Sequence, residues 1–272
     1  MDVVERNFFR LLRAGAFATE EQIEPLSAWK WKRLYQLSQM HGVTPWVNDG
    51  VERCRSQFFT NLIPDSVAKL LQKGTPKESD ETEDSNTMLT SDHLTNPLLN
   101  HKLQDILDDE HSSTETRHLL LLILGTARFV MNAGIPVKRI TEMGLFLRQS
   151  ANRIDFLQLQ TWIHRLRLDT MAQLSAVMLV KLLHFKPEEL PFMKPSTEQQ
   201  MEHCVKDMLQ QKNSHAEEWY FSQGKDIFVH TSNSSAMLWQ VRRSASNFKY
   251  FPAESVTNFM ASFAHSLSHI EE

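Results

Sequence analysis

The hydrophobic positions of this chain recur at helical spacing over most of its length, and short polar motifs separate one apolar stretch from the next. Asp2 precedes the first stretch, with Glu5 placed as its capping-box partner, and Gly15 is expected to end that helix. Large apolar residues repeat every three positions between Ser27 and Gly42, which predicts a second helix over that range.

Further helix starts are marked by prolines, which a helix tolerates in its first turn, and by capping residues. They lie at Pro45, Pro64, Asn96-Pro97, Ser112 with Glu115, Pro136, Asp155, Asp169, Ser196 with Gln199, and Pro252. The helices that start at Ser112, Pro136, Asp155 and Asp169 are expected to end at Gly134, Arg148, Arg167 and Phe185, respectively. The alternation typical of strands is nearly absent, and Ile227-Phe228-Val229 is the short candidate. The pattern predicts an all-α fold of about ten helices in an irregular multi-helix bundle, with little or no sheet.

Six consecutive aliphatic residues, Leu119 to Leu124, lie in the helix that follows Ser112. His118 and Arg128 bracket this run, which is far shorter than the ~20 residues that a membrane span requires. The run therefore predicts a helix buried on most sides at the centre of its domain. On this basis the replacement Leu122→Asp is expected to prevent folding, because it would bury an unpaired charge.

One stretch interrupts the helical pattern. Residues 74–95 are polar and acidic, and they contain no large apolar residue before Met88. Such a stretch buries too little surface to offset the entropy lost on ordering, so we expect a flexible acidic linker. The sequence therefore predicts an N-terminal helical module at residues 1–73, the linker at 74–95 and a C-terminal helical core at 96–272.

Composition excludes several classes of protein. The 272 residues are 41% hydrophobic and 23% charged, which is typical of a soluble globular chain. The eight glycines are scattered singly, so no phosphate-binding loop of the Walker or dinucleotide type is present in the sequence. Two cysteines cannot form a disulfide framework, and the acidic N-terminus lacks the basic region of a signal peptide. We expect a cytoplasmic protein with no membrane span.

The charge is unevenly distributed, although the formal net charge is only -4. Residues 74–116 carry a net charge of -9, and residues 117–186 carry +7. The candidate binding residues are six basic side chains in the second block: Lys138, Arg139, Arg148, Arg153, Arg165 and Arg167. Such a block can bind a polyanion. The alternative is that these side chains are exposed helix faces, partly neutralised by the acidic linker.

The candidates for metal binding and nucleophilic catalysis are weak. His265 and His269 have the i, i+4 spacing of a two-histidine zinc motif, but residue 266 is serine and no third ligand is apparent. Cys54 lies between Arg53 and Arg55, which could lower the pKa of its thiol, but no histidine is near it in the sequence. His203-Cys204 has no CxxC partner.

The densest cluster of carboxylates is Asp105, Asp108, Asp109 and Glu110. These residues have helical spacing, whereas a magnesium site on a strand needs two carboxylates one residue apart. A solvated helix end is therefore expected there. The sequence predicts no catalytic residue, no metal site and no cofactor.

Three stretches resemble a known family. They are Trp31–Pro45, which contains His41-Gly42-Val43; Gly134–Leu147 with Ile154-Asp155 and Leu166-Arg167-Leu168; and Arg243 through Phe251-Pro252 to Glu254. Together they resemble the helical parts of the uncharacterised nucleotidyltransferase-like proteins common in Bacteroidota. The catalytic palm of that family carries a Gly-Ser turn and an Asp-x-Asp pair, and this sequence contains neither. The resemblance implies a shared helical framework without the palm.

Two functional hypotheses follow. The first is a non-catalytic scaffold or regulatory protein that binds another macromolecule, with a protein as the expected partner and a polyanion as a possible one. The second is a divergent magnesium-dependent nucleotidyltransferase.

Overall fold

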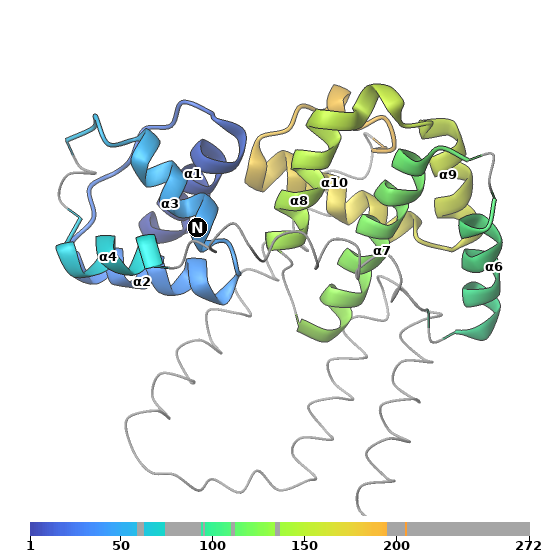
Figure 1. The fold of residues 1–272 in the computed structure, drawn as a ribbon, viewed down its shortest axis with the longest axis horizontal. Helices are drawn as coiled ribbons and strands as arrows, with labels where there is room; N and C mark the ends of the chain where they lie inside the picture. The colour runs from blue at the N-terminus through green and yellow to red at the C-terminus, as the bar shows by residue number, and fades with distance from the viewer. Residues whose placement is uncertain are drawn as a thin grey trace, which may run out of the picture. The chain divides into compact units, whose positions relative to one another are not determined.

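The computed structural model describes residues 1–58, 63–73, 94, 96–109, 112–133, 137–194 and 205 (Figure 1). Nine α-helices and two short 3-10 helices form within these residues, and the same residues contain no strand. The all-α prediction is confirmed. Several predicted features lie outside the described residues. They are the helices expected from Ser196 and Pro252, the strand candidate Ile227–Val229 and nearly all of the acidic stretch 74–95.

The contacts divide the chain into two units. The first contains the described residues of Met1–Ser91 together with Val137–Gln149 and Leu182–Phe185. The second contains those of Asp92–Pro136, Ser150–Lys181 and Lys186–Glu272. The division into residues 1–73, 74–95 and 96–272 remains a prediction. The contacts show in addition that two short segments from the C-terminal half, Val137–Gln149 and Leu182–Phe185, group with the N-terminal helices.

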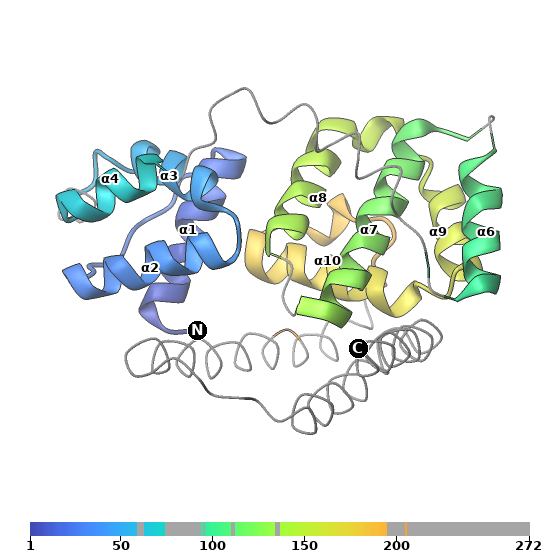
Figure 2. The same cartoon turned by 60° about the horizontal axis from the view of Figure 1, so that its bottom comes forward.

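The first unit is built on four N-terminal helices: α1 (Val3–Phe17), α2 (Ala28–Met40), α3 (Thr44–Arg53) and α4 (Asp65–Lys73). Helix α8 (Val137–Ser150) lies mainly in the same unit. The most extensive packing joins α1 to α3, and α2 contacts α1, α3 and α4. Figure 2 shows α1 beside α3.

The second unit contains α6 (Pro97–Leu107), α7 (Thr114–Ala133), α9 (Phe156–Arg165) and most of α10 (Asp169–Leu183). Its 3-10 helices are Ala151–Arg153 and Pro187–Glu189. Helix α7 packs against α9. A bond between the Asp155 amide and the Thr116 hydroxyl, 2.9 Å long, joins the start of α9 to the first turn of α7.

Three of the predicted N-caps are present. The Asp2 carboxylate accepts a bond of 2.8 Å from the Glu5 amide, and the Glu5 carboxylate accepts one of 2.9 Å from the Asp2 amide, so the capping box is complete. The side chains of Asn96 and Asp155 each accept bonds from two amides of the following turn. Each bond satisfies an amide that has no partner within its helix.

Other predicted helix ends are displaced. Helix α1 continues through Gly15 to Phe17 and ends at Ala18, which has a left-handed backbone. The cap of α7 is Ser113 in place of Ser112, because the Ser113 hydroxyl accepts from the Thr116 amide at 3.3 Å. Helices α9 and α10 end two residues earlier than predicted, each before a residue with positive φ, and Asp169 lies inside the first turn of α10.

Gly15 and Gly50 allow α1 and α3 to approach closely. A Cβ atom on Gly15 would lie 1.8 Å from the Trp46 carbonyl oxygen, and one on Gly50 would lie 1.9 Å from the Leu11 carbonyl oxygen. Both obstacles are backbone atoms, which cannot rotate away as a side chain can. Glycine is therefore required at both positions by the helix contact.

We expect Gly50→Ala to lower the free energy of unfolding by about 2 kcal/mol. Overpacking typically costs about 1–3 kcal/mol or more, and the better helix propensity of alanine offsets about 1 kcal/mol. Urea denaturation measures the loss. Gly144→Ala is the comparison, because a Cβ at that position meets the ring ends of Phe17 and Phe185 at 3.0 Å and its effect should be smaller. Equal stability of the Gly50 variant and the wild type would contradict this account of the α1–α3 contact.

The aliphatic run of α7 is largely buried, as predicted, but not uniformly. Leu119, Leu120, Ile123 and Leu124 have no exposed surface and Leu121 has very little. Leu122, in contrast, is only partly buried. Leu122→Asp is therefore the least suitable of the six possible substitutions for testing whether this helix forms the core, because the other five side chains are more deeply buried.

Candidate binding surface

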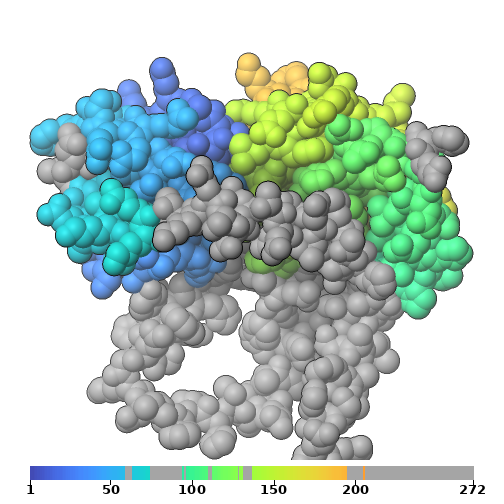
Figure 3. Space-filling model, viewed as in Figure 1, coloured from blue at the N-terminus to red at the C-terminus, as the bar shows by residue number. Residues whose placement is uncertain are grey.

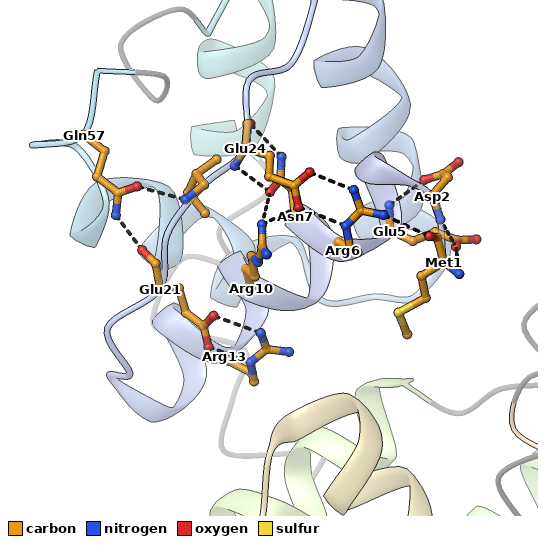
Figure 4. Close-up of polar contacts among 11 residues, drawn as sticks. Met1, Asp2, Glu5, Arg6, Asn7, Arg10, Arg13, Glu21, Glu24 and Gln57 are labelled. Atoms are coloured by element: carbon orange, nitrogen blue, oxygen red, sulfur yellow. Dashed lines mark hydrogen bonds and ion pairs between the residues drawn. The ribbon is translucent and has the colours of Figure 1, made fainter.

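A row of basic side chains on α1 holds the connecting segment 18–27 in place (Figure 4). Arg6 forms two bonds to the Glu24 carboxylate, of 2.9 and 2.7 Å, and Arg10 adds a third of 2.6 Å. Arg13 binds the Glu21 carboxylate through two bonds of 2.6 and 2.9 Å. The three arginines lie three or four residues apart, so they occupy one face of the helix.

These charges neutralise one another. The hydrogen bond from Arg6 is the main cause that lowers the pKa of Glu24 to about 2, and the charge of Arg6 and the bond from Arg10 act in the same direction. The pKa of Arg6 is raised, chiefly by its bond to Glu24. Both groups therefore stay ionised at neutral pH, and their partners are already within the same unit. This cluster serves to fix the chain between α1 and α2.

Cys54 does not have the environment that its flanking arginines suggested. The side chain is buried, and burial raises the pKa of the thiol, with the charge of Glu21 acting in the same direction. Arg55 forms an ion pair of 3.1 Å with Glu52. The prediction that the arginines could lower this pKa is wrong, because burial and the charge of Glu21 both raise it.

The carboxylates of the acidic cluster lie at the end of α6, as expected for a solvated helix end. Asp105 is exposed and pairs with Arg165 at 2.7 Å and with His101 at 3.2 Å, and Asp108 is the C-terminal cap. Glu110, the His265–His269 pair and His203-Cys204 lie outside the described residues. Within the part of the chain that is described, no three histidine, cysteine or acidic side chains are grouped so that they could hold a metal ion.

The six basic candidates are divided between the two units, with Lys138, Arg139 and Arg148 in the first. Lys138 is 3.8 Å from Glu142 on the same helix. The guanidinium carbon of Arg148 lies 4.8 Å from the centre of the Phe17 ring and 4.5 Å from that of Phe185. Arg148 thus packs against two aromatic rings that also contact each other edge to face.

The other three candidates, Arg153, Arg165 and Arg167, lie in the second unit. Arg153 pairs with Glu115 at 3.1 Å, and Arg165 pairs with Asp105 as described above. Arg167 is exposed, and its left-handed backbone follows the end of α9. Four of the six side chains therefore have carboxylate or aromatic partners in their own unit, and whether the six form one binding face remains a prediction.

A surface that sequence reasoning missed lies on α2 and α4. Trp29 exposes 67% of its surface, whereas Trp31, two residues later, exposes none. Two residues turn a helix by about 200°, so the two tryptophans point in opposite directions. Met40, which is 44% exposed, lies eleven residues after Trp29 and so returns to the same face. The helical phase of the two tryptophans indicates that they lie on opposite faces of α2, but which of the two is buried depends on the helices that pack against α2.

Lysines accompany these apolar side chains. Lys30 and Lys32 flank Trp29 on α2, and Lys69 and Lys73 lie on the neighbouring α4. The outer surface of α4 is visible at the left of Figure 3, in cyan. We call the set of Trp29, Met40 and these four lysines the α2/α4 surface.

Comparison of the chain with protein-family models, with curated proteins and with solved structures found no match. The resemblance to nucleotidyltransferase-like proteins therefore remains a prediction from the sequence. Among the described residues, no helix combines the length and the apolar character needed to cross a membrane.

Proposed function

We propose that this protein acts by binding another protein, as a scaffold or regulatory component, through the α2/α4 surface. The observation that carries the proposal is the exposure of Trp29 in the first turn of α2, on the outward face of that helix. Tryptophan is strongly enriched among the residues that contribute most to protein–protein binding. An indole ring can bury about 150–250 Å² of surface against a partner, and a tryptophan that stays in water lacks the hydrophobic stabilisation of that burial.

The buried face of α2 supports this role. Trp31, Leu34, Tyr35 and Ser38 are buried and hold the helix in the first unit. The opposite face is consequently presented by a helix whose position is already determined by packing. A rigid helix face loses little conformational entropy on binding, which favours affinity.

Capture experiments with the full chain test this proposal. We expect at least one cellular protein to be retained by the immobilised wild type and by Leu98→Ala, and to be reduced about tenfold or more with Trp29→Ala. Leu98 is the matched control, because it is 77% exposed but lies on α6. Quantitative mass spectrometry of the retained proteins provides the measurement. Retention of the same proteins at the same level by Trp29→Ala would contradict the proposal.

The alternative hypothesis, a divergent magnesium-dependent nucleotidyltransferase, makes a different prediction. Isothermal titration of the full chain with each of the four nucleoside triphosphates and magnesium should show no binding under our proposal. Magnesium-dependent binding in the micromolar range would overturn the non-catalytic role.

A further inference from the structure

The lysines of the α2/α4 surface differ from six other cations of the first unit. Arg6, Arg10, Arg13, Arg33, Arg55 and Lys138 each form an ion pair with a carboxylate. Lys30, Lys32, Lys69 and Lys73 form no ion pair with any described residue. Lys32, Lys69 and Lys73 are also exposed. The α2/α4 surface therefore carries four lysines that are not held in ion pairs by the described part of the protein.

The positive charge surrounds an apolar centre. On α2, Lys32 lies about 60° around the helix axis from Trp29, and Lys30 lies about 100° away on the other side. On α4, Leu70 is 40% exposed and lies between Lys69 and Lys73 in the sequence. Interfaces between proteins have this composition, with aromatic and apolar anchors at the centre and charges at the rim.

We infer that the α2/α4 surface recognises an acidic polypeptide segment in which carboxylates flank an aromatic or aliphatic anchor. This inference rests on the proposed function and adds the chemical class of the partner. The anchor would pack against Trp29, and the carboxylates would pair with the lysines around it. Rim charges of this kind mainly raise the association rate and select the partner, whereas the apolar anchor supplies affinity.

Two other classes of partner fit the surface less well. A single-stranded nucleic acid can stack a base on Trp29, but its binding depends on many cations along the backbone, and the apolar side chains of Met40 and Leu70 would gain little from it. An anionic membrane binds amphipathic helices through their apolar face. The apolar face of α2 is buried within the unit, as Trp31 and Leu34 show.

Fluorescence anisotropy with the full chain tests the inference. The probe is a fluorescein-labelled synthetic peptide of glutamates interrupted by a single Leu-Phe pair. We expect saturable binding that weakens about tenfold in the double variant Lys32→Glu/Lys69→Glu and about as much in Trp29→Ala. Lys186→Glu is the matched charge reversal, because Lys186 is exposed but lies in the second unit, and it should leave binding unchanged. Added salt should weaken the binding of the wild type.

Further probes separate the possible occupants. A peptide with Ser-Ser in place of Leu-Phe should bind at least about tenfold more weakly. Oligothymidylate that binds as tightly as the Leu-Phe peptide, with the same dependence on Lys32 and Lys69, would overturn the inference in favour of a polyanion. Equal binding of the peptide to the wild type and the double lysine variant would also overturn it. Sedimentation provides a third test. A dimer of the wild type that the substitution Trp29→Ala dissociates would also overturn the inference, because a second copy of the chain would then occupy the surface.

The two proposals fail in distinguishable ways. If Trp29-dependent capture of a cellular protein succeeds and the acidic peptide does not bind, the function stands and the inference about charge is wrong. If the peptide binds and no cellular protein is captured in a Trp29-dependent manner, the surface recognises acidic peptides and the proposed function is wrong.

Discussion

Replacing Ile123 with aspartate is expected to abolish folding of the second unit, whereas Leu122→Asp is expected to leave a folded but less stable protein. Ile123 has no exposed surface, and Leu122, on the same helix α7, is only partly buried. Burying an unpaired carboxylate in an apolar core costs several kcal/mol, which is a large part of the roughly 5–15 kcal/mol that stabilises a typical domain. At Leu122 the charged group can reach solvent.

Circular dichroism and thermal denaturation of the two variants measure this difference. The pair is well matched, because the residues are adjacent in one helix and the introduced side chain is the same. Ile123→Ala is the control for loss of volume without charge, and it should reduce stability by about 2–5 kcal/mol. A folded Ile123→Asp variant with the melting temperature of the wild type would show that α7 does not form the core of its unit.

Replacing Arg13 with methionine is expected to reduce the free energy of unfolding by about 3–5 kcal/mol, because it breaks a buried ion pair and leaves one charge unpaired. The side chain of Arg13 is 6% exposed and that of Glu21 is 12% exposed. The same guanidinium donates a bond of 2.9 Å to the Leu182 carbonyl. One side chain therefore joins α1, the segment that follows it, and the residues at the end of α10 that belong to the first unit.

A double variant separates the cost of the unpaired charge from the value of the pair. Arg13→Met/Glu21→Leu should recover a substantial part of the loss, because no carboxylate then remains without a partner. Arg6→Met is the surface control: its side chain is 43% exposed, and its loss should have a much smaller effect. Urea denaturation of the four proteins provides the comparison. Similar losses for Arg6→Met and Arg13→Met would contradict the assigned role of burial.

The local helix signals were predictable from the sequence. The capping box of Asp2 and Glu5 and the caps at Asn96 and Asp155 are present, and Gly42 has the positive φ expected after α2. Each of these features depends on atoms within one helical turn. The exact helix ends were less predictable. Helix α1 continues through Gly15, because the glycine is needed there for the close approach of α3 and does not end the helix.

The candidate sites were harder to predict, because they too depend on contacts between helices that are distant in the sequence. The block of positive charge at residues 117–186 was evident in the sequence, but the partners of its members were not, since Glu115 and Asp105 come from other helices. The raised pKa of the Cys54 thiol could not be predicted from its flanking arginines, because burial is a property of the folded chain.

The sequence by itself determined that this protein is helical and where most of its described helices begin, because helical periodicity and capping are short-range. Only the tertiary structure decided which charges are neutralised and which faces remain exposed. Trp29 and Trp31 are two residues apart and chemically identical, yet one is exposed and the other is fully buried. The difference arises because α1, α3 and α4 pack against α2 and cover one side of it, and no signal within α2 specifies which neighbours those will be.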